Sequence, residues 1–143
     1  MELKFNGKSI MEVLAGEVQH EVDRCAKEIT SYIIPANPIW SGRMVNAWQW
    51  SKDTLEMKPV PYWDGVTRSV TFKDGSVREF PVNPLPRPTP EAVIPKFNYE
   101  STEFPTVFMS CSVDWAYEVD QGVGRYTKPA HNLVLKGIQK AMQ

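Results

Sequence analysis

The amino-acid sequence predicts an α+β (α/β) fold in which a long N-terminal helix and a C-terminal helix pack on a small, mostly antiparallel sheet. Three observations predict it. Apolar residues recur every three or four positions over residues 9–33, a second such stripe reaches the C-terminus, and two β-rich runs flank an Asp-Gly pair. The 143 residues match one domain of about 100–150 residues. We therefore expect a single domain, 1–143, with an insertion over about residues 55–105.

Charge and composition exclude several functional classes. The 16 Lys and Arg residues against 17 Asp and Glu residues give a net charge of −1, whereas a dedicated nucleic-acid-binding domain has a pI above about 9. Two cysteines are too few for a disulfide scaffold. No apolar run approaches the roughly 18 residues of a membrane span, and the first residues lack the apolar stretch of a signal peptide. We expect a soluble protein made in a reducing cytosol, with no membrane partner.

The N-terminal helix is predicted over about residues 9–33. Ser9 and Glu12 have the spacing of a capping box, in which each side chain bonds the other residue's amide. Pro35 is expected to end the helix, because proline disfavours a helical residue before it. The apolar stripe consists of Met11, Leu14, Ala15, Val18, Val22, Cys25, Ala26, Ile29 and Ile33.

A short second helix is predicted after a turn at residues 35–41. Ser41 is placed to cap it, and it would continue through Trp48. Gly42 is a poor helix former, so this helix would depend on packing. The stretch over residues 50–60 is expected to be extended.

A β-hairpin is predicted over residues 66–82. Residues 66–72 and 77–82 are the two strands, and Asp74 with Gly75 supplies the positive φ values that a tight hairpin turn needs. The hairpin is expected to project from the body.

A proline-rich arm follows the hairpin over residues 81–95. Proline fixes φ and lacks an amide donor, so neither a helix nor a central strand is expected there. We expect an extended, polyproline-like arm. Its prolines are Pro81, Pro84, Pro86, Pro88, Pro90 and Pro95.

The C-terminal part is predicted to be a strand, a helical turn and a helix. Residues 106–113 have strand composition, and Asp114 is expected to cap a turn of helix that begins at Trp115. Gly122 is expected to adopt a left-handed conformation that releases the chain into a loop. Pro129 is expected near the start of the terminal helix.

No catalytic, cofactor-binding or metal site is expected. A metal site needs three or four convergent ligands, whereas the histidines are only His20 and His131. Cys25 and Cys111 have no nucleophile signature around them and are interpreted as small core residues. Two alternatives remain open: a small hydrolase or nuclease that uses His20 or His131, and a peptide- or sugar-binding module that uses the tryptophans.

Two segments together resemble the tail-completion, or head–tail joining (neck), family of tailed bacteriophages, which includes minor tail proteins of the lambda Z type. Residues 41–48 are similar to the family's Thr-Gly-Arg-Leu-x-x-Ser-Trp-like segment. Residues 115–122 resemble Tyr-Ala-x-x-Val-Glu-x-Gly, with Trp and Asp in the Tyr and Glu places, and a Pro-Ala step and a helix follow. The resemblance covers residues 1–54 and 106–143. The motif positions are Ser41, Gly42, Trp48, Trp115, Ala116, Asp120 and Gly122.

The resemblance implies a structural virion protein and not an enzyme. It implies a ring subunit at the phage neck or head-proximal tail end, made in the host cytoplasm, that completes the tail and joins it to the head. Its partners would be copies of itself, the tail terminator or tail tube, and head–tail adaptor proteins, with DNA passing through the lumen without specific binding. The alternative in the same setting is a tail-terminator or head–tail adaptor ring subunit. A basic patch, or simply a solvated face, is expected from Arg125, Lys128, Lys136 and Lys140.

The insertion then suggests an interface. The hairpin and the proline-rich arm are expected to contact a neighbouring subunit or partner ring, because pre-ordered extended segments lose little entropy on docking. Deleting residues 83–95 is expected to leave the monomer folded but to stop its incorporation into particles. The candidate interface residues are Asp74, Gly75, Pro84, Pro86, Pro88 and Phe97.

Overall fold

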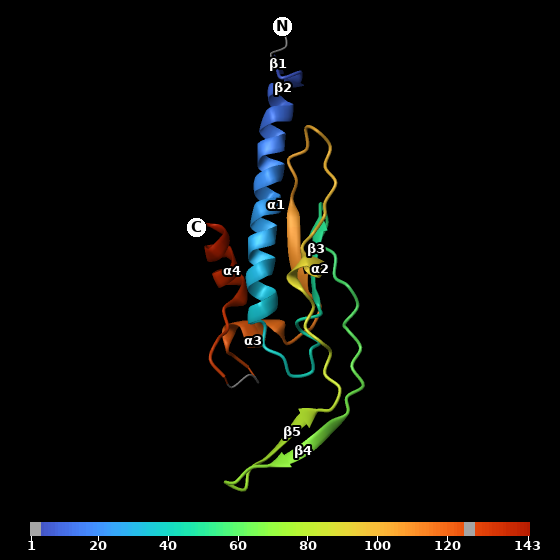
Figure 1. Ribbon diagram of the computed structural model, residues 1–143, viewed down its shortest axis with the longest axis vertical. Helices are drawn as coiled ribbons and strands as arrows, with labels where there is room; N and C mark the ends of the chain where they lie inside the picture. The colour runs from blue at the N-terminus through green and yellow to red at the C-terminus, as the bar shows by residue number, and fades with distance from the viewer. Residues whose placement is uncertain (1–3, 125–127) are drawn as a thin grey trace.

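A computed structural model describes residues 4–124 and 128–143 and confirms the α+β class (Figure 1). In the described residues the strands pair as three antiparallel two-stranded sheets, β1–β2, β3–β6 and β4–β5. The elements in chain order are β1 (Lys4–Phe5), β2 (Lys8–Ser9), α1 (Ile10–Ala36), β3 (Trp48–Lys52), β4 (Thr67–Thr71), β5 (Val77–Pro81), α2 (Pro90–Val93), β6 (Val107–Cys111), α3 (Ala116–Gln121) and α4 (Leu133–Ala141).

The long helix α1 forms the central column of the molecule. In Figure 1, α4 lies along one side of α1, and the β3–β6 sheet lies on the other side. Gly137 of α4 lets the two helices approach closely, since a Cβ there would lie 3.3 Å from a methyl carbon of Ile29. Both helices therefore lie on the same side of the sheet, and α1 separates α4 from it. The buried core cluster consists of Ile33, Ile34, Met44, Val45, Ala47, Trp48, Val113, Val119 and Leu133.

The N-terminal cap of α1 is confirmed, and its C-terminal end differs from the prediction. The Ser9 hydroxyl accepts a hydrogen bond from the Glu12 amide at 3.2 Å, and the Glu12 carboxylate accepts one from the Ser9 amide. The helix runs through Pro35 to Ala36 instead of ending at residue 33. Proline is tolerated there because it removes a single helical donor in the last turn, and the Asn37 amide still donates to the Ile33 carbonyl at 2.9 Å.

The predicted short helix over residues 41–48 is wrong. This segment consists of tight turns, and β3 begins at Trp48. Gly42 has a φ of +82°, which a right-handed helix does not accommodate. Extended structure was predicted over residues 50–60, but the strand ends at Lys52.

The hairpin and its projection are confirmed. Strands β4 and β5 pair from Thr67 opposite Pro81 to Thr71 opposite Val77, and Gly75 in the turn has a φ of +86°. Figure 1 shows the hairpin extending away from the body, at the end of the molecule opposite the N-terminus.

The proline-rich segment is extended apart from one short helix, which corrects the prediction. Helix α2 spans Pro90–Val93. Pro90 occupies the first helical position, where a backbone N–H would have no helical partner in any case.

The C-terminal part has the predicted order of elements with shifted boundaries. Strand β6 pairs with β3, from Trp48 opposite Cys111 to Lys52 opposite Val107. The residue that precedes α3 is Trp115, so the predicted cap by Asp114 is wrong by one position. Helix α4 begins at Leu133, later than Pro129 suggested.

Within the described part of the chain, no helix combines the length and the apolar character needed to cross a membrane.

Candidate functional site

The first motif segment, residues 41–48, is a turn that holds the proline-rich segment. The Ser41 carbonyl accepts a hydrogen bond from the Leu85 amide at 2.7 Å, and the Ser41 hydroxyl accepts one from the Arg43 amide at 3.3 Å. A Cβ at Gly42 would lie 2.1 Å from the Leu85 carbonyl oxygen, so only glycine fits. At the other end of the segment, the Trp48 indole N–H donates to the buried Asn37 side chain at 2.8 Å. The motif positions 41, 42 and 48 therefore have structural roles.

The second motif segment, residues 115–122, fixes the start of α4. Asp120 is 9% exposed, and its carboxylate accepts a hydrogen bond from the amide of Leu133, the first residue of α4. The Asp120 carbonyl accepts from the Asn132 amide at 2.9 Å, and the other carboxylate oxygen accepts from Gln121. A carboxylate at this position is favourable because helix N-termini expose unpaired amides and partial positive charge. Asp120 is thus the cap that α4 lacks within its own segment.

Gly122 closes the same corner. It ends α3 with a φ of +65°, which confirms the predicted left-handed conformation. A Cβ there would lie 2.5 Å from the backbone nitrogen of Ala130. The glycine of the second motif and the Pro129–Ala130 step are therefore in direct contact, and Ala116 packs against the core from the first turn of α3.

The two motif segments meet at one pocket. A cavity of about 510 Å³ is lined by residues 38–44 together with Trp63, Trp115, Val119 and Lys128. Among the described residues most of the lining side chains are apolar, and the two charged ones, Arg43 and Lys128, are both cations. Sequence reasoning did not identify this pocket, because its walls come from four separate parts of the chain.

Arg43, one of the lining residues, is held by two contacts. Its guanidinium carbon lies 5.2 Å from the centre of the Trp115 ring, within the range of a cation–π contact. Its Nε–H donates to the Pro61 carbonyl at 3.2 Å. The ring of Trp63 meets Trp40 edge-on at 5.4 Å between centroids, and the indole N–H of Trp63 is buried with no acceptor in the described residues.

The candidate interface residues of the hairpin lie at its exposed tip. Asp74 accepts hydrogen bonds from the Ser76 amide at 2.9 Å and the Ser76 hydroxyl at 2.6 Å. These bonds hold the pKa of Asp74 below its ordinary value, because they stabilise the ionised carboxylate. Asp74 and Gly75 are exposed, so the tip is accessible.

The candidate interface residues of the proline-rich segment lie along the body of their own chain. The Arg87 guanidinium donates to the carbonyls of Ile34 and Asn37, the latter at 2.8 Å, and so stabilises the C-terminal end of α1. The Pro86 carbonyl accepts from the Asn46 side chain at 2.9 Å. A deletion of residues 83–95 would remove these contacts, which argues against a folded deletion product. Pro84 and Pro86 are exposed, whereas Pro88 and Phe97 are half-buried.

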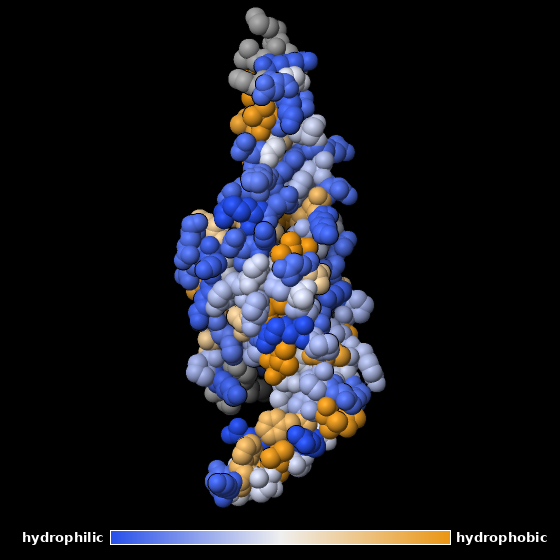
Figure 2. Space-filling model, viewed as in Figure 1, coloured by the Kyte–Doolittle hydropathy of each residue, from blue (hydrophilic) through white to orange (hydrophobic). Residues whose placement is uncertain are grey.

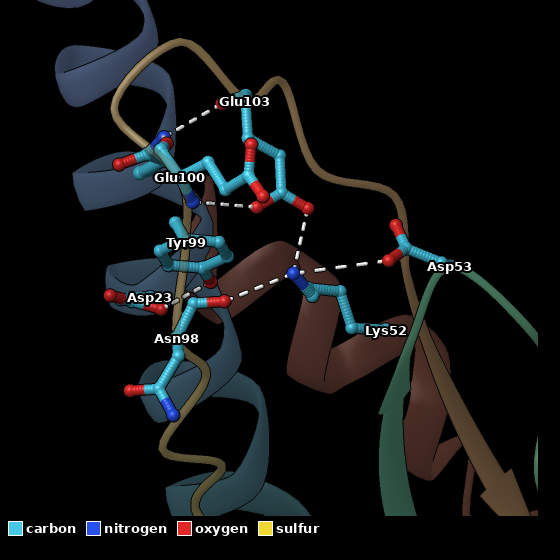
Figure 3. Close-up of polar contacts among 8 residues, drawn as sticks. Asp23, Lys52, Asp53, Asn98, Tyr99, Glu100 and Glu103 are labelled. Carbon is cyan, nitrogen blue, oxygen red and sulfur yellow. Dashed lines mark hydrogen bonds and ion pairs between the residues drawn. The ribbon is translucent and has the colours of Figure 1, made fainter.

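A polar cluster that sequence reasoning missed joins β3 to the loop before β6 (Figure 3). The Lys52 ammonium lies 2.7 Å from the Glu103 carboxylate, 3.0 Å from the Asn98 carbonyl and 3.8 Å from the Asp53 carboxylate. This pairing raises the pKa of Lys52 and lowers that of Glu103. The Glu103 carboxylate also accepts from the Glu100 amide at 3.0 Å.

The same loop is tied to α1. The Tyr99 hydroxyl donates to Asp23 at 2.7 Å, and burial together with this bond raises the pKa of the phenol. The Gln19 side chain donates to the carbonyls of Glu100 and Glu103, both at 2.8 Å. No local pattern in the sequence signals these pairs, because the partners lie far apart along the chain.

The residues considered for catalysis or metal binding do not form one site. His20 is exposed on α1, whereas His131 lies in the segment that precedes α4. Among residues 4–124 and 128–143, no group of three His, Cys, Asp or Glu side chains could hold a metal. In the expected basic patch, Lys128, Lys136 and Lys140 are exposed, and Arg125 lies outside the described residues.

Comparisons with protein-family models, with curated proteins and with solved structures found no match to this chain.

Proposed function

We propose that this chain is a structural subunit of a tailed-phage neck, a ring component that completes the head-proximal end of the tail and joins it to the head. The proposal starts from the resemblance of residues 41–48 and 115–122 to the tail-completion family. Its ring neighbours would be copies of itself, the tail terminator or tail tube, and the head–tail adaptor.

The observation that carries the proposal is that both motifs have a structural role, namely to hold another segment of the chain in place. Although they lie far apart in the chain, both are architectural: Gly42 seats the proline-rich segment, and Asp120 with Gly122 fixes α4. The geometry supplies a reason for each motif residue without invoking catalysis. Both segments also border the same pocket, which supports a role in holding partners.

The exposed apolar surface also supports a protein that binds other proteins. Figure 2 shows apolar side chains on the projecting hairpin and near the N-terminal end of α1. Val77 in the hairpin is 61% exposed, and Met11 and Leu14 of α1 are 51% and 50% exposed. Large exposed apolar residues that gather on projecting elements are typical of interaction surfaces.

The test is electron microscopy of lysates from a phage that carries a nonsense mutation in this gene. Separate DNA-filled heads and free tails are expected, and a plasmid copy of the intact gene should restore joined particles. The shape of the tail end would separate completion from termination. Joined, infectious particles without the protein would refute the proposal and would favour the enzyme or the binding module.

A further inference from the structure

The pocket between the two motif segments has the properties of a binding site for an acidic, apolar peptide segment. Its volume of about 510 Å³ falls within the range of roughly 300–1,000 Å³ that is typical of ligand pockets. Trp40, Trp63 and Trp115 supply aromatic walls, and Met44 and Val119 add aliphatic surface. Such walls favour a large aromatic or aliphatic side chain as the occupant.

Two side chains at this pocket carry donor groups that have no acceptor among the described residues. The Nε of Arg43 is used by Pro61, but its two terminal amino groups make no hydrogen bond to the described residues. Lys128 is likewise unpaired within the described part of the chain. The indole N–H of Trp63 also has no acceptor among the described residues, but it is buried and is therefore not open to an occupant.

The positive charge of the pocket lining therefore favours an occupant that carries a negative charge. Both charged lining residues are cations, and among the described residues no carboxylate lines the pocket. Arg43 is already oriented by the Trp115 ring and the Pro61 carbonyl, so little of its side-chain entropy remains to be lost on pairing. A guanidinium bonds a carboxylate more strongly than it bonds a neutral acceptor.

We propose that this pocket binds a segment of a partner protein that places an aromatic or large aliphatic side chain between the tryptophans and an adjacent Asp or Glu against Arg43 and Lys128. This inference rests on the pocket alone and goes beyond the proposed assembly role. Evidence against peptide binding would therefore not refute the assembly role, and the reverse also holds.

The test is a titration of the full chain with short capped peptides, followed through the indole N–H signals in proton–nitrogen NMR spectra. The probe is acetyl-Asp-Leu-Phe-Glu-amide, and the matched control is the neutral acetyl-Asn-Leu-Phe-Gln-amide. We expect the acidic peptide to shift the Trp63 signal and to bind roughly tenfold more tightly than the neutral one. Equal binding of both peptides, or no shift of the Trp63 signal, would overturn the proposal.

Two variants connect the binding to the named cations. Arg43→Gln and Lys128→Gln are each expected to lower the affinity for the acidic peptide several-fold. Neither should change the affinity for the neutral peptide. Lys136→Gln, an exposed change on α4 outside the pocket, is the matched control and should have no effect. Lys128 is exposed, so its variant tests the proposal even if Arg43→Gln fails to fold. If Lys128→Gln and a folded Arg43→Gln both bind the acidic peptide with unchanged affinity, the proposed role of the two cations is refuted.

Other occupants give different results in the same experiment. Sodium phenylacetate that binds as tightly as the peptide would indicate a small-molecule anion site and overturn the peptide assignment. Self-association of the free chain that Arg43→Gln abolishes would assign the pocket to a second copy, which would also overturn it.

Discussion

At the scale of single residues, the motif positions act through backbone contacts between distant segments. Asp120 reaches the first amide of α4, and Gly42 leaves room for the Leu85 carbonyl. The first contact depends on the Asp120 carboxylate, and the second depends on the absence of a Cβ at Gly42. Single substitutions at these positions should therefore have large effects, whereas similar residues outside these contacts should tolerate change.

Replacing Asp120 by alanine is expected to lower the free energy of unfolding by about 1–3 kcal/mol, because α4 loses its cap and buried amides lose an acceptor. The measurement is urea denaturation followed by circular dichroism. Asp114→Ala is the matched control, since Asp114 is exposed and does not cap α3; it should change the free energy by less than about 0.5 kcal/mol. Equal effects of the two substitutions would contradict the capping role.

Replacing Gly42 by alanine tests the close approach of the proline-rich segment. Gly42 and Gly65 have similar φ values of +82° and +73°, but only Gly42 has a neighbour where the Cβ would lie. Gly65→Ala should therefore cost only the left-handed strain of about 1 kcal/mol. Gly42→Ala should cost clearly more, measured by thermal or urea unfolding of the pair. A Gly42→Ala protein as stable as Gly65→Ala would show that the segment moves aside freely.

At the scale of elements, the chain predicts those structures whose determinants are local. Ser9 with Glu12 predicts the start of α1, and Asp74 with Gly75 predicts the hairpin turn; each acts within four residues. The turn at Gly42 was missed because its cause, Leu85, lies in another segment.

The candidate site shows the same difference between features set by local sequence and features set by contacts between distant segments. The motif residues are identifiable from spacing, but the pocket that they border is not, since Trp63 and Lys128 reach it from separate loops. The path of the proline-rich segment was also missed, because Arg87 binds the end of α1, a partner that no local pattern indicates.

The loop at residues 98–104 is expected to loosen at acidic pH. The Lys52 ammonium holds the pKa of Glu103 below its ordinary value of 4.5, so folding favours the ionised carboxylate. Its contribution to the free energy of unfolding is complete above that ordinary value and is lost as the pH falls through the lowered one. The pKa of Lys52 is raised, so that group contributes below its ordinary 10.5 and loses its effect only at more alkaline pH.

Hydrogen exchange of the Glu100 amide, which donates to Glu103, measures this loosening. Its protection relative to α1 amides should fall as the pH drops below about 4. Glu103→Gln should have lower protection at neutral pH and little further change on acidification. If the Glu100 amide loses as much protection on acidification in Glu103→Gln as in the unmodified protein, the effect belongs to other carboxylates.

At the scale of the whole molecule, the projecting hairpin and the N-terminal end of α1 lie at opposite ends of an elongated body (Figure 1). The body between them contains the core, the polar cluster and the pocket. This division separates segments that stabilise the fold from segments available to neighbours. The proline-rich segment, predicted to be an arm, belongs to the first group, because Leu85 and Arg87 bind the body.

Removing the hairpin while keeping the proline-rich segment is expected to leave a folded protein that does not support particle assembly. Val66 and Val82 are joined by a backbone hydrogen bond of 3.0 Å, so an Asn-Gly pair can replace residues 67–81 between them. The measurements are the thermal unfolding of the purified variant and its ability to complement a phage with a nonsense mutation in this gene. Normal complementation would show that the hairpin makes no essential contact.

The pairing of β3 with β6 has a consequence for synthesis on the ribosome. Lys52 and Val107 are register partners, so the whole insertion is translated between the two strands of one sheet. While it emerges, β3 has no partner, and α1 has neither the sheet on one side nor α4 on the other. The α1 residues that the fold buries, such as Ala26, Ile33 and Ile34, are thus uncovered until β6 and α4 have left the exit tunnel.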